Sequence, residues 1–277
     1  MRRQHMADHL DVHGVSETML WTLYNRASES LRDDAFFHDR DAERIFEALD
    51  YPFERHFGAA DSSHAARALA FDAVLSAWLA KHPDGTVVEL GCGLETQCLR
   101  LDNGQVRWLA VDMPQAMALR ERFITPHARL HHWRGDACAL QWMDAVDAAG
   151  PVFVSAQGLL MYLHPDQVRA LLQGVAARFA QLEVMFDVVP PWVALLTQSP
   201  AGLWKTAHYR VPPMHWGINA SALPGRLRQW LGPQWEVHWI DYPPCRGLPA
   251  WYSQWAMAWP WSRELLPGMA HLQRRLR

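Results

Sequence analysis

Residues 86–101, "TVVELGCGLETQCLRL", join a short apolar run to a turn that contains two glycines. The run 86–90 has the length and the β-branched content of a buried strand. Gly91 and Gly93 follow it directly, and a glycine-rich turn after the first strand of an open α/β sheet lets the backbone approach a ligand closely. The stretch therefore predicts a ligand site at the carboxyl end of a strand in a parallel sheet.

Further strand signals follow along the chain. Short apolar runs separated by helical patterns occur at 106–112, 128–133, 151–156 and 182–187. This alternation predicts an α/β fold with a parallel sheet, helices on both faces and right-handed crossovers. Pro165 opens one of these helices, whose apolar stripe runs to Phe179.

The residues before the sheet, 1–82, read as amphipathic helices. Ser16 is a candidate N-cap, and apolar stripes run from Leu20 to Leu31 and from Ala66 to Trp78. We therefore expect a helical cap over 1–82 that packs on a core of residues 83–187. The chain is expected to form a single domain, residues 1–277.

The last third of the chain differs in composition, because most of the fifteen tryptophans lie after position 190. The segment 188–234 is rich in proline and aromatic residues, and we interpret it as a substrate lid with a helix at 220–231. In the C-terminal region 235–277, strand-like runs at 235–242 and 251–259 predict an antiparallel hairpin on the sheet edge.

Composition excludes several classes of protein. The 277 residues are half hydrophobic, and 26 Lys and Arg nearly balance 29 Asp and Glu. We therefore expect a globular protein without a nucleic-acid partner. The longest apolar stretch, 151–163, is shorter than the roughly 18 residues that span a bilayer, so no membrane partner is expected. Four cysteines without CxxC spacing and an N-terminus without a signal-like apolar core favour the cytoplasm. No metal site is expected, since the adjacent strand residues His131 and His132 face opposite ways.

Acidic residues surround the glycine turn. Glu89 ends the first strand, Glu95 follows the turn, and Asp112 ends the next strand. A dinucleotide-binding turn would have a third glycine where Thr96 stands, which disfavours an NAD-dependent oxidoreductase. S-adenosylmethionine fits better, because its ribose needs an acid and its ammonium and sulfonium groups are cationic.

Six motifs then occur in an order that resembles one family: "ETMLWTLYNRASES", "VVELGCGLETQ", "WLAVDMPQAMALRERF", "GDACAL", "SAQGLLMYL" and "FDVVPP". They resemble the leucine carboxyl methyltransferase superfamily, especially its bacterial tetracenomycin-type O-methyltransferases, over roughly residues 16–235. The resemblance implies a Rossmann-like class I methyltransferase that uses S-adenosyl-L-methionine, with an N-terminal helical cap and a lid insertion.

The resemblance also implies roles for individual residues. Cofactor binding is expected at Arg67, Glu89, Gly91, Gly93, Asp112, Asp136, Ala137 and Gln157. Within this set, Arg67 would bind the cofactor carboxylate, Asp112 the ribose, and Asp136 with Ala137 the adenine. Arg26 would bind a carboxylate of the substrate or the cofactor. Arg210, Trp204, Tyr209 and Trp216 are candidate substrate residues of the lid, and Tyr162, His208 and His215 are the candidate catalytic residues.

The chain departs from the family pattern at two positions. The usual "GLDTR" is "GLETQ" here, so Gln97 replaces a cation that would hold a carboxylate. Gln157 replaces an acid near the sulfonium and keeps only its hydrogen-bonding capacity. These departures leave open whether the fold has lost activity and serves only in binding.

The expected reaction is methylation of a small-molecule oxygen, and the resemblance implies a role in secondary metabolism. A carboxylate acceptor needs no base at neutral pH, whereas a phenol with a pKa near 10 benefits from one. The absence of an evident base favours the carboxylate, and the phenol remains open. A protein C-terminal carboxylate is a further alternative, for which a peptide-sized groove is expected. The oligomeric state is not predicted.

Overall fold

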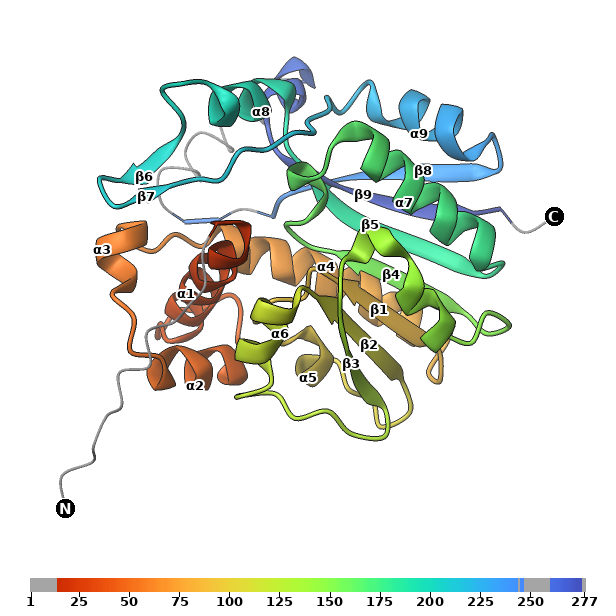
Figure 1. Cartoon of the computed structure of the whole chain (residues 1–277), viewed down its shortest axis with the longest axis horizontal. Helices are drawn as coiled ribbons and strands as arrows, with labels where there is room; N and C mark the ends of the chain where they lie inside the picture. The colour runs from red at the N-terminus through yellow and green to blue at the C-terminus, as the bar shows by residue number, and fades with distance from the viewer. Residues whose placement is uncertain (1–13, 244, 247–259, 276–277) are drawn as a thin grey trace.

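The computed structural model describes residues 14–243, 245–246 and 260–275, and its central element is a seven-stranded sheet (Figure 1). The strand order is β3-β2-β1-β4-β5-β9-β8. The bounds are β1 Thr86–Leu90, β2 Arg107–Asp112, β3 Leu130–Arg134, β4 Val152–Ala156, β5 Leu182–Val188, β8 Trp235–Asp241 and β9 Gly268–Arg274. The first five strands are parallel, which confirms the predicted α/β sheet.

The central strands are apolar because both of their faces are covered. Every residue of β1 and β4 is buried. On β1, Val87 belongs to the hydrophobic core shared with the N-terminal helices, whereas Val88 belongs to the core on the opposite face. The parallel register, with Val88 opposite Leu109 and Val154, places the carboxyl ends of these strands at one edge of the sheet.

The N-terminal helices cover one face of the sheet. They comprise η1 Gly14–Glu17, α1 Thr18–Ser30, α2 Arg40–Ala48, α3 Phe53–Phe57 and α4 Ser63–Leu79. Leu20 and Leu23 of α1 share a core with Leu75 of α4 and Val87 of β1. The expected N-cap role of Ser16 is wrong, because the turn η1 runs directly into α1 and places Glu17 at the cap position.

Helices that follow β4 and precede β8 cover the opposite face. They are α7 Pro165–Arg178 and α9 Leu223–Leu231, which contact each other (Figure 1). Pro165 is the first residue of α7, as its sequence predicts. The shorter elements of the core are α5 Gln97–Arg100, α6 Pro114–Arg120, η2 Ala137–Ala139, η3 Gln141–Ala145 and η4 Leu160–Tyr162.

The segment 188–234 has two parts. Its first part contains α8 Pro191–Gln198 and a short hairpin of β6 Trp204–Thr206 and β7 Tyr209–Arg210, which lies beside α3 (Figure 1). Its second part is α9, which packs against α7 and β8 and so covers the sheet. The first part therefore extends the molecule over the cap helices, and the second belongs to the sheet layers.

The C-terminal strands differ from the expected hairpin. β8 matches the run at 235–242, whereas the run at 251–259 lies outside the described residues. The partner of β8 is β9, which inserts between β5 and β8 and is antiparallel to both. β9 can lie between two strands because its side chains Met269, Ala270 and Leu272 are apolar and become buried there. η5 Pro260–Leu265 precedes it. Among the described residues, no helix is both long and apolar enough to span a membrane.

Candidate active site

Four strand ends gather the residues predicted to bind the cofactor. Gly91 and Gly93 follow β1, Asp112 ends β2, Asp136 follows β3, and Gln157 follows β4. The strands are parallel, so these positions share one edge of the sheet. The contact that joins two of them is a hydrogen bond of 2.7 Å from the Gly93 N–H to Asp112 Oδ2.

The glycine turn is closely packed by protein. Gly91 and Gly93 have positive φ angles of 65° and 44°. A Cβ atom on Gly91 would lie 3.1 Å from Cδ1 of Leu159, and one on Gly93 would lie 2.8 Å from Cβ of Met19. The turn therefore requires glycine both for its backbone conformation and for the approach of these two side chains.

Asp112 and Asp136 shape the turns beyond β2 and β3. Asp112 Oδ1 accepts the Met113 N–H at 2.7 Å, and burial raises the pKa of this carboxyl. Asp136 is exposed and caps η2 by accepting the Cys138 N–H at 2.8 Å. Ala137 is buried beside it, and its carbonyl accepts the Trp142 Nε1–H at 2.9 Å.

Glu89 lies beneath the turn. Its side chain is 1% exposed, its Oε2 accepts the Trp108 Nε1–H at 3.3 Å, and Arg120 lies 3.7 Å away. Burial raises the pKa of Glu89 to about 8, although the Arg120 charge opposes the shift. Arg120 in turn donates to the carbonyls of Gly93 and Glu95, so Glu89 supports the turn from within the protein.

Arg26 belongs to a buried ion-pair network. It is 1% exposed and lies 2.7 Å from Asp39 and 3.0 Å from Glu95, while its Nη2 donates to the Leu94 carbonyl at 2.8 Å. Both terminal nitrogens are engaged by protein groups. The contacts tie α1 to α2 and to the segment after the glycine turn, and they give no support to a role of Arg26 in binding a substrate carboxylate.

Arg100 provides the cation that is missing at position 97. It lies 2.8 Å from Asp72, 2.7 Å from Asp39 and 2.9 Å from Glu95. Gln97 donates to the same Asp72 at 2.7 Å. Burial opposes ionisation of Glu95, but Arg26 and Arg100 outweigh it and lower its pKa to about 2. The sequence analysis did not predict a role for Arg100. Its i, i+3 spacing from Gln97 on one helix is the signal that could have indicated it.

Arg67 forms a second buried pair nearer the strand ends. Its Nη1 donates to Asp187 Oδ2 at 2.8 Å, and Asp187 Oδ1 accepts the Gly158 N–H at 2.6 Å. The pair joins α4, the end of β5 and the turn after β4. Two buried polar groups here have no partner among the described residues: Nε of Arg67 and the side-chain amide of Gln157.

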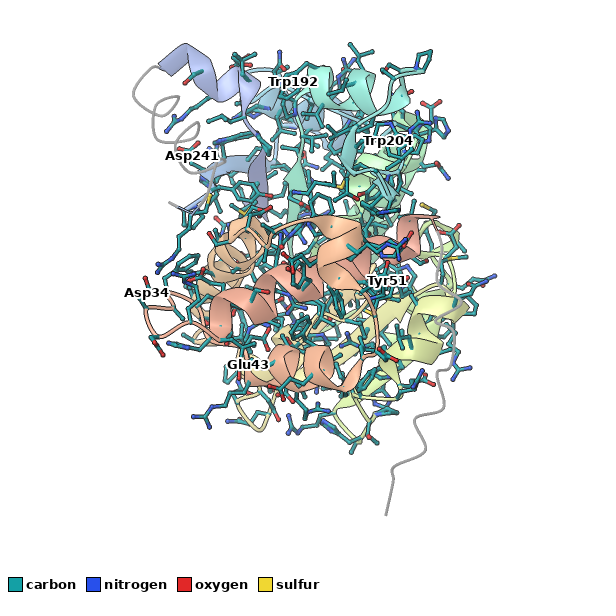
Figure 2. All side chains as sticks on the ribbon, turned by 90° about the vertical axis from the view of Figure 1, so that its left-hand side faces the viewer. Asp34, Glu43, Tyr51, Trp192, Trp204 and Asp241 are labelled. Carbon is teal, nitrogen blue, oxygen red and sulfur yellow. The ribbon has the colours of Figure 1, made fainter. Side chains whose placement is uncertain are left out.

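A cavity of about 470 Å³ adjoins this pair. Aromatic and aliphatic side chains line most of it, among them Trp21, Met161, Tyr162, Trp192 and Tyr242. Its polar lining includes Thr18, Ser63, His64, Arg67, Asp187 and Asp241. In Figure 2, Trp192, Trp204 and Asp241 lie above the cap helices, which are labelled at Glu43 of α2 and at Tyr51 in the loop between α2 and α3.

Of the three candidate catalytic residues, Tyr162 alone is among the described residues that line this cavity. His208 is exposed in the turn between β6 and β7. His215 stacks on His164, with ring centroids 4.2 Å apart, and donates its backbone N–H to Met161. Neither histidine is therefore brought to the cavity.

The candidate substrate residues of the lid also lie outside the cavity lining. Trp204 is 55% exposed, and Arg210 is exposed and donates to the Ser199 carbonyl. Tyr209 is buried against Trp21 and Phe57, with ring centroids 6.0 and 4.7 Å apart. Trp216 packs in the core between the sheet and α7 and α9, on the face away from the N-terminal helices. The hairpin instead covers the cap, and Trp192 of α8 reaches the cavity.

His64 is a cavity residue that the sequence did not reveal. It lies in the first turn of α4, and its Nδ1 is 2.9 Å from Nδ2 of Asn25. Burial and the nearby Arg67 charge lower the pKa of His64 to about 3. A histidine beside an apolar stripe carries no local signal of this placement, because its partner Asn25 belongs to another helix. Among the described residues, no cluster of three potential ligands could hold a metal ion.

Known proteins share both sequence and fold with this chain. A family model for leucine carboxyl methyltransferase matches residues 19–176. The tetracenomycin polyketide synthesis O-methyltransferase TcmP of Streptomyces glaucescens is 32% identical over 244 residues, 86% of this chain and 88% of that protein. The S-adenosyl-L-methionine-dependent methyltransferase dpfgK of Gibberella zeae is 27% identical over 63% of this chain and 66% of that protein.

Among solved structures, the plantazolicin methyltransferase BamL aligns with a TM-score of 0.52 and 12% identity, over 94% of this chain and 97% of that one. The fold, the glycine turn and these relatives define an S-adenosyl-L-methionine-dependent methyltransferase. The chain belongs to the leucine carboxyl methyltransferase family. This membership replaces the alternative of an NAD-dependent oxidoreductase.

Proposed function

We propose that the protein methylates a carboxylate oxygen of a small aromatic acceptor, of the polyketide kind for which its bacterial relative is named. The observation that carries this proposal is a ring-lined cavity whose described proton acceptors are poor bases or already engaged. A carboxylate is ionised at neutral pH and needs no base, whereas a phenol has a pKa of about 10.

Three described side chains of the cavity lining are candidate bases. His64 has a pKa of about 3 and so has little affinity for a phenolic proton. Asp187 is held by Arg67 and Gly158. Asp241 accepts from Trp239 Nε1 at 2.8 Å and from Arg263 at 2.6 Å. These contacts favour an acceptor that arrives already ionised.

The tyrosines of the cavity serve as neutral donors in this proposal. Burial raises the pKa of both Tyr162 and Tyr242, so their hydroxyls stay protonated near neutral pH. A neutral hydroxyl donates a hydrogen bond to a carboxylate and holds it in one orientation. The surrounding rings exclude water, which favours a displacement in which charge is lost.

Two buried polar groups near the strand ends support the assignment of the cofactor to this edge of the sheet. The unpartnered amide of Gln157 and Nε of Arg67 are buried beside the turn, where polar groups need partners. We assign the cofactor ribose to Asp112, the adenine to Asp136 and Ala137, and the methionine portion to the turn of Gly91 and Gly93 with Arg67 and Gln157. Glu89 contributes from beneath the turn. When bound, S-adenosyl-L-methionine provides an electrophilic methyl group on a sulfonium.

In this mechanism the protein acts by orienting the acceptor relative to the methyl group. The bound cofactor would supply the methyl group to the acceptor oxygen as its carbon–sulfur bond breaks, and the protein would have no proton to move. The protein therefore needs to hold the oxygen in line with the methyl group rather than to provide a nucleophile. The arginine pairs and the glycine turn keep the strand ends rigid for this purpose.

The size of the cavity favours a small acceptor over a protein. Its volume of about 470 Å³ lies within the roughly 300–1,000 Å³ of small-molecule sites. A peptide acceptor would need an extended groove. Loss of activity is disfavoured because Asp72 and Glu95 are paired with Arg100 although position 97 carries no cation.

Matched probes test the proposal. We would incubate the protein with S-adenosyl-L-methionine and either 2-naphthoate, 2-naphthol or a leucine-terminated peptide, and measure S-adenosylhomocysteine and the methylated product by mass spectrometry. We expect methyl 2-naphthoate as the main product. Methylation of the naphthol alone would replace the carboxylate proposal by the phenol, and methylation of the peptide alone would favour a protein acceptor. A reaction without acceptor provides the background.

A further inference from the structure

His64 is held in one orientation by polar residues behind it. Nδ2 of Asn25 lies 2.9 Å from His64 Nδ1 and 3.0 Å from Asp61 Oδ1. Oδ1 of Asn25 accepts the Asp61 N–H at 3.3 Å, which defines which end of the amide carries the hydrogens. Asn25 itself is 1% exposed, so this arrangement is shielded from water.

These contacts determine the tautomer of the imidazole. Nδ2 of Asn25 is a donor, so the Nδ1 atom that faces it acts as an acceptor and carries no hydrogen. In a neutral ring the hydrogen is then on Nε2. No described residue forms a hydrogen bond with Nε2, and His64 lines the cavity, so this N–H is available to a molecule inside it.

The ring has further support from a neighbouring aromatic residue and a lysine. Trp21 meets His64 edge to face, with ring centroids 5.0 Å apart. Lys205 of β6 lies 3.4 Å from Asp61 Oδ2 and 4.9 Å from the Trp21 ring centroid. Ser63 also donates its hydroxyl to Asp61. The hairpin, α1 and α4 thus meet at this group and restrict the movement of the ring.

The charge state of His64 agrees with this geometry. Burial and the positive charges of Arg67, Lys205 and Arg26 disfavour the imidazolium, and Asp61 only partly offsets them. The pKa of His64 falls to about 3, so the ring is neutral at pH 7. A neutral ring with one donor differs from a general base, which would present its unprotonated nitrogen to the acceptor.

We propose that His64 is a specificity residue, whose Nε2–H donates a hydrogen bond to the acceptor oxygen that does not receive the methyl group. The inference rests on the proposed function, which places the acceptor in this cavity. For a carboxylate, the second oxygen takes this bond while the first attacks the methyl carbon. An acceptor without a second oxygen at this point leaves the N–H unpaired and binds less well.

Nitrogen NMR tests the donor directly. In protein with ¹⁵N-labelled histidine at pH 7, we expect the His64 ring to be neutral and protonated on Nε2, with its signals assigned by their loss in His64→Gln. Adding 2-naphthoate to the complex with S-adenosylhomocysteine should shift the Nε2 signal. A proton on Nδ1, a charged ring, or signals unchanged by saturating 2-naphthoate would overturn the proposal.

Two substitutions separate hydrogen bonding from packing. Glutamine retains an N–H donor on a flexible side chain, whereas leucine fills the space without one. We expect His64→Leu to weaken 2-naphthoate binding about tenfold or more, and His64→Gln to change it much less. His38→Gln, an exposed histidine elsewhere, is the control. Thermal melting and the affinity for S-adenosylhomocysteine should be close to the wild-type values. Equal 2-naphthoate affinity in His64→Leu and the wild type would contradict the role of His64.

The two proposals fail in different ways. If 2-naphthol is methylated and 2-naphthoate is not, the carboxylate proposal fails. The NMR and binding measurements with 2-naphthoate then still show whether the His64 N–H binds a carboxylate in this cavity. If 2-naphthoate is methylated equally well by the wild type and His64→Leu, the proposed function stands and the inference about His64 is wrong.

Discussion

Gly91 combines an unusual backbone conformation with close packing. Its φ is 65°, and an added Cβ would lie 3.1 Å from Leu159, whereas Gly104 has a φ of 80° and open space around it. Gly104→Ala should therefore lose only the roughly 1–2 kcal/mol of a left-handed alanine. We expect Gly91→Ala to lose more stability and to weaken cofactor binding, because Leu159 or the turn must shift to admit the new Cβ atom.

Urea denaturation and calorimetry with S-adenosyl-L-methionine compare the two glycine variants. Equal stability losses and an unchanged cofactor affinity in Gly91→Ala would show that neither Leu159 nor the cofactor constrains this position. The comparison is useful because both variants share the same backbone strain.

Asp112 has two expected tasks, and Asp112→Ala removes both. Its Oδ2 accepts the Gly93 N–H, and we assign the cofactor ribose to the same carboxylate. Asp112→Ala should weaken S-adenosyl-L-methionine binding by about 1–3 kcal/mol, since ribose hydroxyls and a backbone donor lose their charged acceptor. Calorimetry checks this, with the exposed Asp50→Ala as control. A folded Asp112→Ala protein with wild-type affinity would remove Asp112 from the site.

At the scale of secondary-structure elements, the buried ion pairs join four helices to the glycine turn. Glu95 contacts Arg26 of α1 and Arg100 of α5, and Arg100 contacts Asp39 before α2 and Asp72 of α4. Removing one member leaves a buried charge without its partner, which costs about 3–5 kcal/mol. The network therefore links the stability of the cap to the geometry of the turn.

Glu95→Gln should destabilise the protein at pH 7 by an amount within that range. The folded pKa of Glu95, about 2, lies below the ordinary value of about 4.3. The unfolded chain therefore binds more protons between these values, and the stabilisation by Glu95 is present above pH 4.3 and lost as the pH falls toward 2. Denaturation at several pH values should show the wild type and Glu95→Gln converging below pH 4.3. A constant difference would contradict this role.

Arg26 is expected to act on stability rather than on acceptor choice. Arg26→Gln should lower the free energy of unfolding by several kcal/mol, because Asp39 and Glu95 lose a buried partner. Its relative rates with 2-naphthoate and 2-naphthol should match those of the wild type. A specific loss of 2-naphthoate turnover in a stable Arg26→Gln protein would instead restore the carboxylate-binding role expected from the sequence.

At the scale of the whole molecule, the pH dependence of turnover reports the acceptor. With saturating cofactor and 2-naphthoate, kcat should be flat from about pH 6 to 9, because acids with a pKa near 4 are ionised throughout. His64 does not titrate in this window, since its pKa is about 3. A rate that rises tenfold per pH unit would indicate an acceptor that must lose a proton.

Titration of Glu89 could also change the rate in this experiment and requires a control. Its pKa of about 8 falls inside the window, and it supports the glycine turn together with Arg120. Measuring the cofactor dissociation constant over the same pH range separates a change in cofactor binding from a change in the acceptor.

The sequence by itself determined the parallel strands, the glycine turn and the family. These features depend on residues close together in the chain, where apolar period and turn chemistry are directly readable. The same local logic failed at β9, because no strand was predicted at Gly268–Arg274. Its place between β5 and β8 depends on pairing with residues far away in the chain.

Only the tertiary structure decided which polar residues reach the cavity. Arg26 and Glu95 are 69 positions apart, and Lys205 lies 144 positions from Asp61, so no local pattern relates them. The hairpin that carries Trp204 and Arg210 packs over the cap, while His64 and Tyr242 face the cavity. Contacts over such separations arise from the packing of helices on the sheet, and this packing placed Arg26 in a buried ion-pair network and brought His64 to the cavity.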